Sequence, residues 1–430
     1  MKYIIYTLGC KVNQYETQAM ETMLVKRGHF PAEEGEIADL VIVNTCAVTA
    51  EAGRKSRQAI NRLKEENPDA VVAVSGCYSQ LSPDTAEKLG AHVVFGSGEH
   101  EKLIEAAEKA FLSGEHTRLI DNPLQRRVFE DLPAGAAEGR TRALLKIQDG
   151  CVNFCTYCII PYTRGRLRSL PMEEAAKKAA ELQSEGFKEL VLTGIEIASY
   201  GVDLPGKPDL ADVICAIAKA APGLRLRLGS LEPSIITEDF CRRLAAAGTV
   251  CNHFHLSLQS GCDTTLKNMN RKYDTAEFFA ITELLRKYFP NCGLTCDTIV
   301  GFPGETEQHQ RETLDFLSKV GFSDVHIFPY SRRPGTPADK MPDQIDRATK
   351  ARRSKEARAV GAETRKAFLE SQVGKILPVL FETEEGGYWQ GHSDNYLVVR
   401  ATGKCLRGVV KNVKILGVSG ENLVGTAIDG

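Results

Sequence analysis

The sequence predicts an α/β protein in three parts: a parallel sheet flanked by helices, an incomplete βα barrel, and a small all-β barrel. Three observations predict this fold class. Short runs rich in Val and Ile alternate with amphipathic stretches from the start of the chain. The alternation restarts near residue 142 with longer helical stretches, and after residue 370 short strands separated by glycines replace it. With 430 residues, the chain has room for about two to four domains.

The first part, residues 1–120, is expected to be a parallel sheet with helices on both faces. Its apolar runs are short and continuous, which is typical of strands whose two faces are both covered. We expect strands at 2–8, 39–45, 70–76 and 91–95, and helices at 13–27, 51–66, 83–89 and 100–112. Residues 121–141 contain Pro and Gly without a sustained period and are predicted to be a linker.

The second part, residues 142–370, contains six βα units, two fewer than a complete eight-unit barrel. We expect strands at 142–148, 188–193, 224–229, 253–259, 293–300 and 324–329, and helices at 171–186, 208–221, 235–247, 274–288 and 306–320. In such barrels the chemistry lies on the loops that follow the strands. A charged helix, expected to start at a proline and span 342–370, leads into the all-β part at 371–430.

Composition and charge exclude several classes of protein. Apolar residues make up 43% of the chain and charged residues 26%, as in ordinary globular proteins. The 54 basic and 56 acidic residues give a net charge of −2. Any contact with nucleic acid must therefore come from local basic patches. No apolar run approaches the roughly 18–20 residues of a membrane span. The apolar start is short for a signal peptide, so we expect a cytoplasmic protein without membrane association.

Cysteine is the most informative residue type. The chain has 13 cysteines, an odd number, and no export signal, which favours metal or redox chemistry over a disulfide scaffold. Cys151, Cys155 and Cys158 follow the first barrel strand with the spacing C-x3-C-x2-C. Three thiolates on a four-iron cluster leave one iron open to a substrate. The alternatives are unconnected thiols or a zinc loop, although zinc usually takes four ligands and no fourth ligand lies close in sequence.

A second set of three cysteines is expected to converge through the fold. Cys10, Cys46 and Cys77 are the cysteines of the first part, and each follows the end of a predicted strand. Because the carboxyl ends of parallel strands lie at one edge of a sheet, the three side chains should meet there. A single buried cysteine would be unremarkable as a small apolar residue. Three in the same position relative to their strands predict a second cluster site.

The spacing of the 151–158 triplet resembles the signature of radical S-adenosylmethionine (SAM) enzymes. Together with the N-terminal cysteines and the stretches HLSLQSG at 255–261 and GFPGET at 301–306, the whole chain resembles the methylthiotransferase family of these enzymes. The resemblance implies an N-terminal cluster domain, a radical SAM barrel and a C-terminal TRAM domain. It also implies two [4Fe-4S] clusters, SAM, and an electron donor such as flavodoxin or ferredoxin.

In that family the triplet's cluster cleaves one SAM to a deoxyadenosyl radical, the other cluster holds the sulfur to be transferred, and a second SAM supplies a methyl group. The stretch 9–17, GCKVNQYET, resembles the bacterial branch that acts on threonylcarbamoyladenosine at position 37, in the anticodon loop of tRNA. Alternatives are the branches that act on isopentenyladenosine in tRNA or on a ribosomal-protein aspartate. A non-enzymatic alternative is an iron–sulfur redox sensor that binds RNA.

The resemblance implies further residues around SAM, each with an ordinary structural role as its alternative. The candidates are Tyr157, Gly194, Glu196, Glu232, Ser257, Gln259, Gly301 and Glu305. Strand 253–259 alternates apolar and polar residues, so its polar set is expected to face the barrel interior.

Contacts to tRNA phosphates are expected from local arginines and lysines. Three arginines occupy alternate positions after the cluster loop, and two more lie in the charged helix. The candidates are Arg164, Arg166, Arg168, Arg352, Arg353 and Lys404. The alternative for the helix is a solvated charged face.

Overall fold

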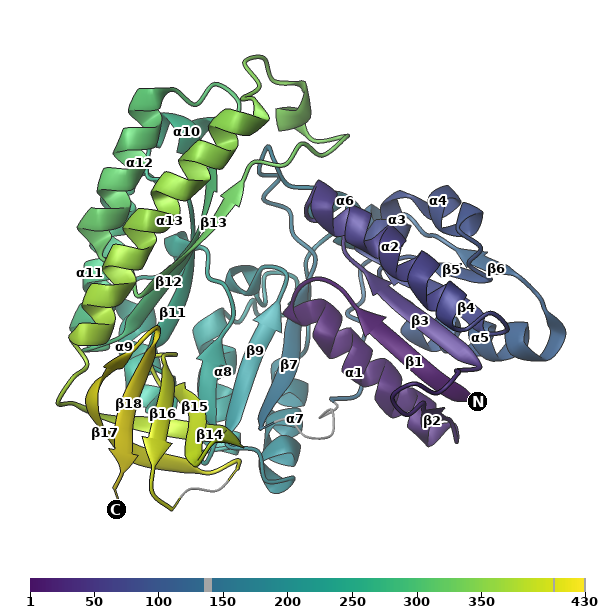
Figure 1. The fold of residues 1–430 in the computed structure, drawn as a ribbon, viewed down its shortest axis with the longest axis horizontal. Helices are drawn as coiled ribbons and strands as arrows, with labels where there is room; N and C mark the ends of the chain where they lie inside the picture. Colours follow the sequence, from purple (N-terminus) through teal and green to yellow (C-terminus); the bar gives the residue numbers. More distant parts are fainter. Residues whose placement is uncertain (135–140, 405–406, 429–430) are drawn as a thin grey trace.

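The computed structural model describes residues 1–134, 141–404 and 407–428. Figure 1 shows three parts: a parallel sheet with helices at one side, a barrel of strands and helices in the middle, and a small β barrel below. This arrangement confirms the predicted fold class. Residues 135–140 of the predicted linker, and 405–406 and 429–430 of the predicted all-β part, lie outside the described residues.

The first part is a six-stranded parallel sheet. Its strands in spatial order are β2 (Phe30–Pro31), β1 (Lys2–Thr7), β3 (Leu40–Thr45), β4 (Val71–Gly76), β5 (Val93–Phe95) and β6 (Thr117–Leu119). The four predicted strands are confirmed. The short edge strands β2 and β6 were not expected, because two or three residues are too few to show a period in the sequence.

Helices cover both faces of this sheet, which is why its central strands are continuously apolar. On one face the buried core joins the strands to α1 (Lys11–Lys26) and α5 (His100–Ser113). On the other face it joins them to α2 (Ala50–Glu66) and α4 (Pro83–Lys88). All residues of β3 and β4 are buried, so alternating strand residues supply the two cores.

The second part is an open barrel built from two sheets. Its six parallel strands are β7 (Arg142–Asp149), β9 (Glu189–Gly194), β10 (Arg225–Leu228), β11 (His253–Gln259), β12 (Gly293–Val300) and β13 (Asp324–Pro329). Two isolated bridges connect the two sheets near β10, one from Leu226 of β10 to Val250 and one from Leu231, just after β10, to Leu256 of β11. The two-residue β8 (Arg168–Ser169) pairs antiparallel with β7. The outer helices are α7 (Met172–Ser184), α8 (Leu210–Ala220), α9 (Glu238–Ala247), α11 (Thr275–Tyr288) and α12 (Glu307–Val320).

The long helix α13 (Arg347–Glu370) lies along the barrel beside β13 and α12, as Figure 1 shows. It begins at Arg347, five residues later than the predicted start at Pro342. The Asp346 side chain accepts a hydrogen bond from the backbone N–H of Thr349 and caps the helix. This acidic cap provides the starting signal in place of the proline. Short helices α6 (Ile160–Arg164) and α10 (Asp263–Asn268) were not expected.

The third part is a closed five-stranded barrel, as predicted. Its strands in spatial order are β14 (Ile376–Glu385), β15 (Tyr388–Ser393), β16 (Val398–Thr402), β18 (Asn422–Ala427) and β17 (Val410–Ser419). We expected purely antiparallel strands, but β16 pairs with β18 in parallel. That parallel pair closes the barrel.

The third part is held to the second by buried charges. Arg227 is 1% exposed, donates to the carboxylate of Glu189, and reaches the backbone carbonyls of Ser393 and Asp394 at 3.1 and 3.0 Å. The ring of Tyr396 lies 4.6 Å from the guanidinium carbon of Arg227. These contacts fix the loop between β15 and β16 against the barrel.

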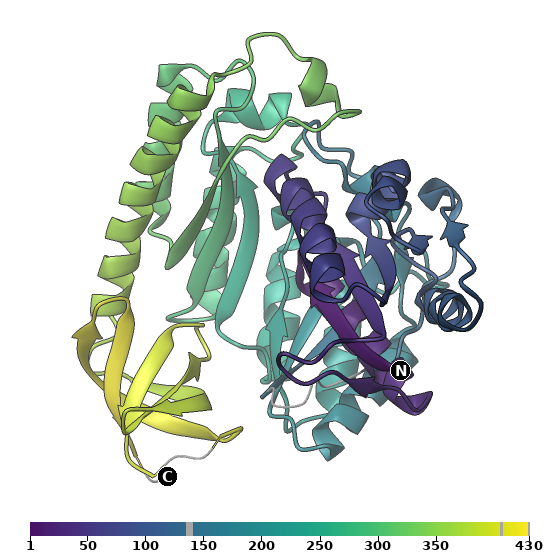
Figure 2. The same ribbon diagram turned by 45° about the vertical axis from the view of Figure 1, so that its right-hand side comes forward.

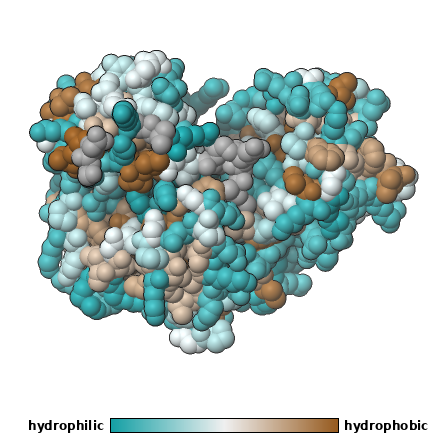
Figure 3. Space-filling view, turned by 90° about the horizontal axis from the view of Figure 1, so that it is seen from below, coloured by the Kyte–Doolittle hydropathy of each residue, from teal (hydrophilic) through white to brown (hydrophobic). Residues whose placement is uncertain are grey.

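The first part stands against one side of the barrel, as Figures 1 and 2 show together. Helix α1 contacts β7 and β9, so its N-terminal end lies beside the barrel strands. Seen from below, the surface is mainly hydrophilic, and its hydrophobic residues form small groups (Figure 3). Within the described ranges, none of the helices combines the length and apolar character that crossing a bilayer requires.

Candidate functional site: two cysteine trios around one chamber

The three N-terminal cysteines lie together at one edge of the first sheet. Cys10 separates β1 from α1, Cys46 follows β3, and Cys77 begins α3 (Cys77–Leu81) directly after β4. The Cys46 thiol packs on Gly9, where an added Cβ would lie 3.2 Å from its sulfur. Burial, and to a smaller extent the neighbouring Cys77 and Cys10 thiols, raise the pKa of Cys46 to about 11. The expected convergence at the sheet edge is therefore present.

One arginine from the barrel reaches this trio. Arg164 Nε lies 3.3 Å from the Cys77 sulfur, and Arg164 Nη2 donates to Asn13 Oδ1 at 2.9 Å. The Cys10 thiol lies 3.6 Å from the same Asn13 oxygen. Arg164 also donates to both carboxylate oxygens of Glu16. The guanidinium therefore links the N-terminal cysteines to the barrel and places positive charge beside them.

The second trio lies in the loop after β7. The Cys151 N–H donates to the Gly165 carbonyl at 2.9 Å, and the Cys158 N–H donates to the Cys155 carbonyl at 2.9 Å. Burial raises the pKa of the Cys151 and Cys158 thiols to about 12. Thiols in such surroundings ionise only with a compensating positive charge, and a bound metal supplies one. The donor set therefore fits an iron–sulfur cluster.

Two glycines shape the backbone immediately before cysteines of the two trios. Gly76 has φ +101°, and an added Cβ there would lie 2.5 Å from the Thr45 carbonyl oxygen. Gly150 has φ +75°, and an added Cβ would overlap the Arg166 carbonyl oxygen. A side chain would be strained and would clash at both positions. Each glycine therefore fixes the turn that presents the cysteine that follows.

The spacing of both trios disfavours the zinc alternative. In a tetrahedral zinc site, thiolate sulfurs 2.3 Å from the metal lie about 3.8 Å apart. Among the described residues, one set of ligand atoms lies entirely within 4.8 Å of one another, and it is formed by His255, Asp297 and His326. In neither cysteine trio do all three sulfur atoms lie as close to one another as a zinc ion would require. A larger iron–sulfur cluster, whose ligands lie farther apart, fits this spacing better.

Charged side chains surround the second trio. Arg271 Nη1 lies 3.3 Å from the Cys155 sulfur, and Arg271 also forms an ion pair with Glu232. The Glu196 carboxylate accepts a hydrogen bond from Asn153 Nδ2 at 3.3 Å. Burial, and then the nearby Glu232, raises the pKa of Glu196 to about 7. Two of the carboxylates predicted to contact SAM thus lie beside the cluster loop.

A cavity of about 630 Å³ is shared by all three parts of the chain. Cys10 and Lys11 line it from the first part, Gly194 and Asp297 from the barrel, and Tyr396 from the third part. Cys10, a member of the first trio, is therefore part of the cavity wall. Gly194, one of the predicted SAM contacts, lies on the same wall.

A smaller cavity of about 240 Å³ adjoins it and is lined by Tyr157, Cys158 and Gln259. Val48, from the first part, also lines this cavity. Asp297 lines both cavities. One cysteine of each trio, Cys10 and Cys158, therefore lines one of two cavities that share Asp297 in their walls, and we call these two cavities together the chamber. Tyr157 and Gln259 lie with Cys158 in the wall of the smaller cavity.

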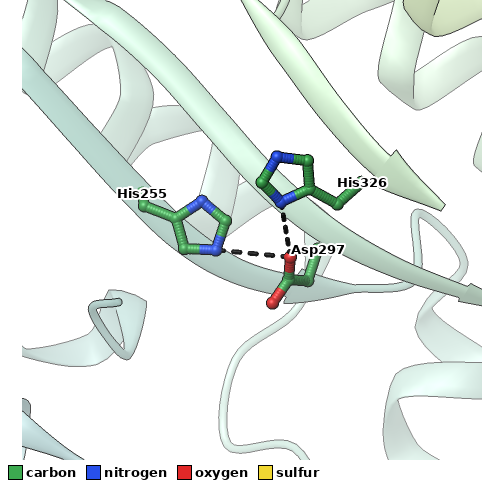
Figure 4. A group of neighbouring side chains, drawn as sticks. All are labelled: His255, Asp297 and His326. Carbon is green, nitrogen blue, oxygen red and sulfur yellow. Dashed lines mark hydrogen bonds and ion pairs between the residues drawn. The ribbon is translucent and has the colours of Figure 1, made fainter. Parts of the chain in front are cut away.

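The middle of the chamber wall carries a triad of polar side chains, shown in Figure 4. His255 Nε2 lies 3.3 Å and His326 Nδ1 lies 3.1 Å from the same oxygen of Asp297. Burial alone raises the pKa of Asp297, but hydrogen bonds from the two histidines outweigh it and hold that pKa below its usual value. The Asp297 carboxylate is therefore held ionised between the two rings.

The carboxylate in the loop at 301–305 is bonded within the protein. The Glu305 carboxylate accepts from the Gly301 N–H at 2.8 Å and from Arg353 Nη1 at 2.8 Å. It is 5% exposed and ties the loop to α13. The backbone carbonyl of Ser257 accepts from Arg271 Nη2 at 3.1 Å. Contacts of Glu305 and Ser257 with SAM stay predictions.

Three arginines that we expected to contact phosphates are buried, and these expectations were wrong. Arg164 is completely buried, while Arg168 and Arg353 are each 3% exposed. The Glu16 carboxylate, which pairs with Arg164, also lies 3.4 Å from the buried Lys146 ammonium. Such side chains are satisfied inside the protein, because a buried charge without a partner is costly.

The other predicted phosphate contacts lie on the surface. Arg166 and Lys404 are exposed, as such a contact requires. Arg352 is 47% exposed but forms ion pairs with Glu307 and Glu356. Its charge is therefore partly compensated, which agrees with the solvated-helix alternative for this residue.

Sequence reasoning missed three side chains at this site. Arg271 follows the short helix α10, away from any predicted strand end, so no pattern marked it. Lys11 could have been found from its place directly after Cys10. His326 could have been found as a polar residue between the apolar residues of a barrel strand, where parallel pairing of β12 with β13 sets it opposite Asp297.

Comparisons with known protein families match two regions of the chain. Residues 145–317 match the Radical SAM superfamily, and residues 2–96 match a family described as Uncharacterized protein family UPF0004. The first match contains the second cysteine trio, and the second match contains the first trio.

Curated relatives cover almost the whole chain. A threonylcarbamoyladenosine tRNA methylthiotransferase from Bacillus subtilis is 40% identical, over 96% of this chain and 93% of the relative. An enzyme of the same description from Thermotoga maritima is 35% identical over 99% and 96%. A tRNA-2-methylthio-N(6)-dimethylallyladenosine synthase from Carboxydothermus hydrogenoformans is 34% identical over 96% of both chains.

Solved structures support the fold alone. The radical SAM methyltransferase TsrM from Kitasatospora setae, with tryptophan and a SAM analogue bound, matches with a TM-score of 0.58. The two sequences are 17% identical, and the match covers 79% of this chain and 75% of that one.

Proposed function

Because the chain belongs to the radical SAM methylthiotransferase family, we propose that it converts N6-threonylcarbamoyladenosine at position 37 of tRNA into the 2-methylthio derivative. The observation that carries this proposal is that Cys10 of the first trio and Cys158 of the second line two cavities that share Asp297 in their walls. Sulfur insertion at a carbon without an acidic hydrogen needs radical and sulfur chemistry at the same substrate atom. Relatives that are 40%, 36% and 35% identical to this chain are named as threonylcarbamoyladenosine tRNA methylthiotransferases, which favours that substrate within the family.

The family implies a [4Fe-4S] cluster and SAM, and Cys151, Cys155 and Cys158 are the residues that would hold the cluster. We further propose a second [4Fe-4S] cluster at the N-terminal trio, held by Cys10, Cys46 and Cys77. When bound, these groups supply the one-electron cleavage of SAM and the sulfur that is transferred. We propose that reduction comes from a small electron-transfer protein such as flavodoxin or ferredoxin, in the cytoplasm.

The chain's own residues would bind and orient the reactants. Glu196 and Glu232, beside the triplet, would receive the ammonium group of SAM, and Gly194 leaves space for its backbone contacts. Tyr157 and Gln259 line the cavity next to Cys158 and would enclose the cofactor and exclude water. Arg271 would orient Glu232 and place positive charge at the Cys155 sulfur.

The tRNA would enter between the three parts of the chain. We propose domains at 1–120, 142–370 and 371–430, with 121–141 as the linker between the first two. Tyr396 of the third domain lines the chamber, so this domain would contact the anticodon loop around adenosine 37. Arg166 and Lys404 are exposed and would contact phosphates.

A second candidate substrate is dimethylallyladenosine, since several relatives are named as synthases of its 2-methylthio form. The two substrates can be separated directly. The anaerobically reconstituted protein is expected to methylthiolate an anticodon stem-loop carrying threonylcarbamoyladenosine, detected as a nucleoside in which SCH3 replaces hydrogen. A stem-loop carrying dimethylallyladenosine should react much more slowly.

The matched control is the same protein with Cys151, Cys155 and Cys158 replaced by Ala, which should release no deoxyadenosine from SAM. Faster reaction of the dimethylallyl RNA would show that dimethylallyladenosine is the preferred substrate instead. SAM cleavage without modification of either RNA would leave the ribosomal-protein aspartate as the substrate to examine. A wild-type protein that cleaves no SAM would favour the redox-sensor alternative.

A further inference from the structure

The acidic groups of the chamber are already paired. Asp297 accepts from both histidines of the triad. Asp324, which also lines the 630 Å³ cavity, forms an ion pair with Arg365 at 2.8 Å. These pairs leave little uncompensated negative charge on this wall, so a further cation nearby would act on a ligand instead.

Lys11 provides such a cation. It is exposed, begins helix α1, and lines both the 630 Å³ cavity and a neighbouring one of about 430 Å³. Among the described residues, its ammonium has no hydrogen bond or ion pair in the structure. Because it directly follows Cys10, a ligand held by Lys11 would lie close to the N-terminal trio.

His326 lines the same 630 Å³ cavity. Its side chain is 51% exposed, and its Nδ1 contacts the Asp297 carboxylate. The contact uses Nδ1 and leaves Nε2 pointing away from Asp297, as Figure 4 shows. The hydrogen bond to Asp297 also raises the pKa of His326, which favours the protonated ring with an N–H at Nε2.

A lysine ammonium and an imidazolium N–H facing one cavity suit an anionic group. We propose that Lys11 and His326 bind the carboxylate of the substrate's threonyl group and thereby select threonylcarbamoyladenosine over adenosines with uncharged N6 groups. This inference rests on the proposed function. The dimethylallyl group has no charge to offer these residues, whereas the threonyl carboxylate accepts hydrogen bonds from both. Anchoring the N6 substituent here would orient the adenine ring beside Cys10.

The test compares two anticodon stem-loop RNAs, one with threonylcarbamoyladenosine and one with its methyl ester, which removes the negative charge. Wild-type protein should bind the free acid more tightly by a factor of about ten to a hundred, the usual effect of charge-assisted hydrogen bonds. The Lys11→Met variant should lose most of this preference by weakening binding of the acid alone. Lys11→Arg should restore much of it.

Lys26→Met is the matched control, because Lys26 ends the same helix and is exposed away from the cavity. It should keep the wild-type preference. Iron content is measured for every variant because Lys11 neighbours a cysteine of the first trio, and all variants should match the wild type. A Lys11→Met protein with normal iron and an unchanged preference for the acid would overturn the inference. If wild-type protein fails to methylthiolate the threonylcarbamoyl RNA, the proposed function itself fails.

Discussion

Replacing Cys10, Cys46 and Cys77 together by Ala is expected to lower the iron content of the reconstituted protein from about eight to about four atoms per chain, because each trio would hold one four-iron cluster. The variant should still cleave SAM on reduction, since Cys151, Cys155 and Cys158 are untouched. It should form no methylthiolated nucleoside. Iron analysis, deoxyadenosine release and nucleoside mass spectrometry measure the three results.

The matched control replaces Cys241, Cys262 and Cys292 by Ala. These thiols are buried, at 0%, 1% and 5% exposure, but belong to neither trio. The control should retain about eight irons even if it is less stable, because core thiols contribute packing and no cluster ligands. Full iron retention in the first variant would contradict the second cluster. Equal iron loss in both variants would show that general destabilisation causes the loss.

Replacing Arg164 by Met is expected to destabilise the junction of the first domain and the barrel by about 3–5 kcal/mol. The change leaves Glu16 buried without its arginine, and Lys146, 3.4 Å away, compensates it only in part. Hydrogen exchange should therefore speed up in α1 and in the 150–165 loop. The double variant with Glu16→Gln should lose less stability than the two single variants combined.

The control for this prediction is Arg54→Met, which removes an exposed ion pair with Glu51. The two side chains are 49% and 55% exposed, so the loss of stability should be much smaller than for Arg164→Met. If Arg164→Met left hydrogen exchange in α1 unchanged, the buried pair would not hold the two domains together.

The fold was largely predictable because its signals are local. Each of the ten strands expected in the first two domains is present, since continuous apolar runs have few other ways to be buried. The meeting of Cys10, Cys46 and Cys77 was also predictable, because strand ends in a parallel sheet share an edge. In contrast, the start of α13 depends on the side-chain cap from Asp346, and a proline nearby suggested an earlier start.

The roles of charged residues were less predictable. Arg164, Arg166 and Arg168 form one alternating set in the sequence, yet the first and last are buried and only Arg166 is exposed. The difference arises from Glu16, 148 residues away from Arg164, which a local pattern does not reveal. Arg271 was missed for the same reason, since its partners come from separate loops.

We expect two iron clusters to border the chamber. This is tested by a crystal structure of the reconstituted protein with anomalous scattering measured at the iron edge. There should be two separate iron positions, one bound by Cys10, Cys46 and Cys77 and the other by Cys151, Cys155 and Cys158, both bordering the cavities that Asp297 lines. A single iron position, or a second one away from the N-terminal trio, would contradict it.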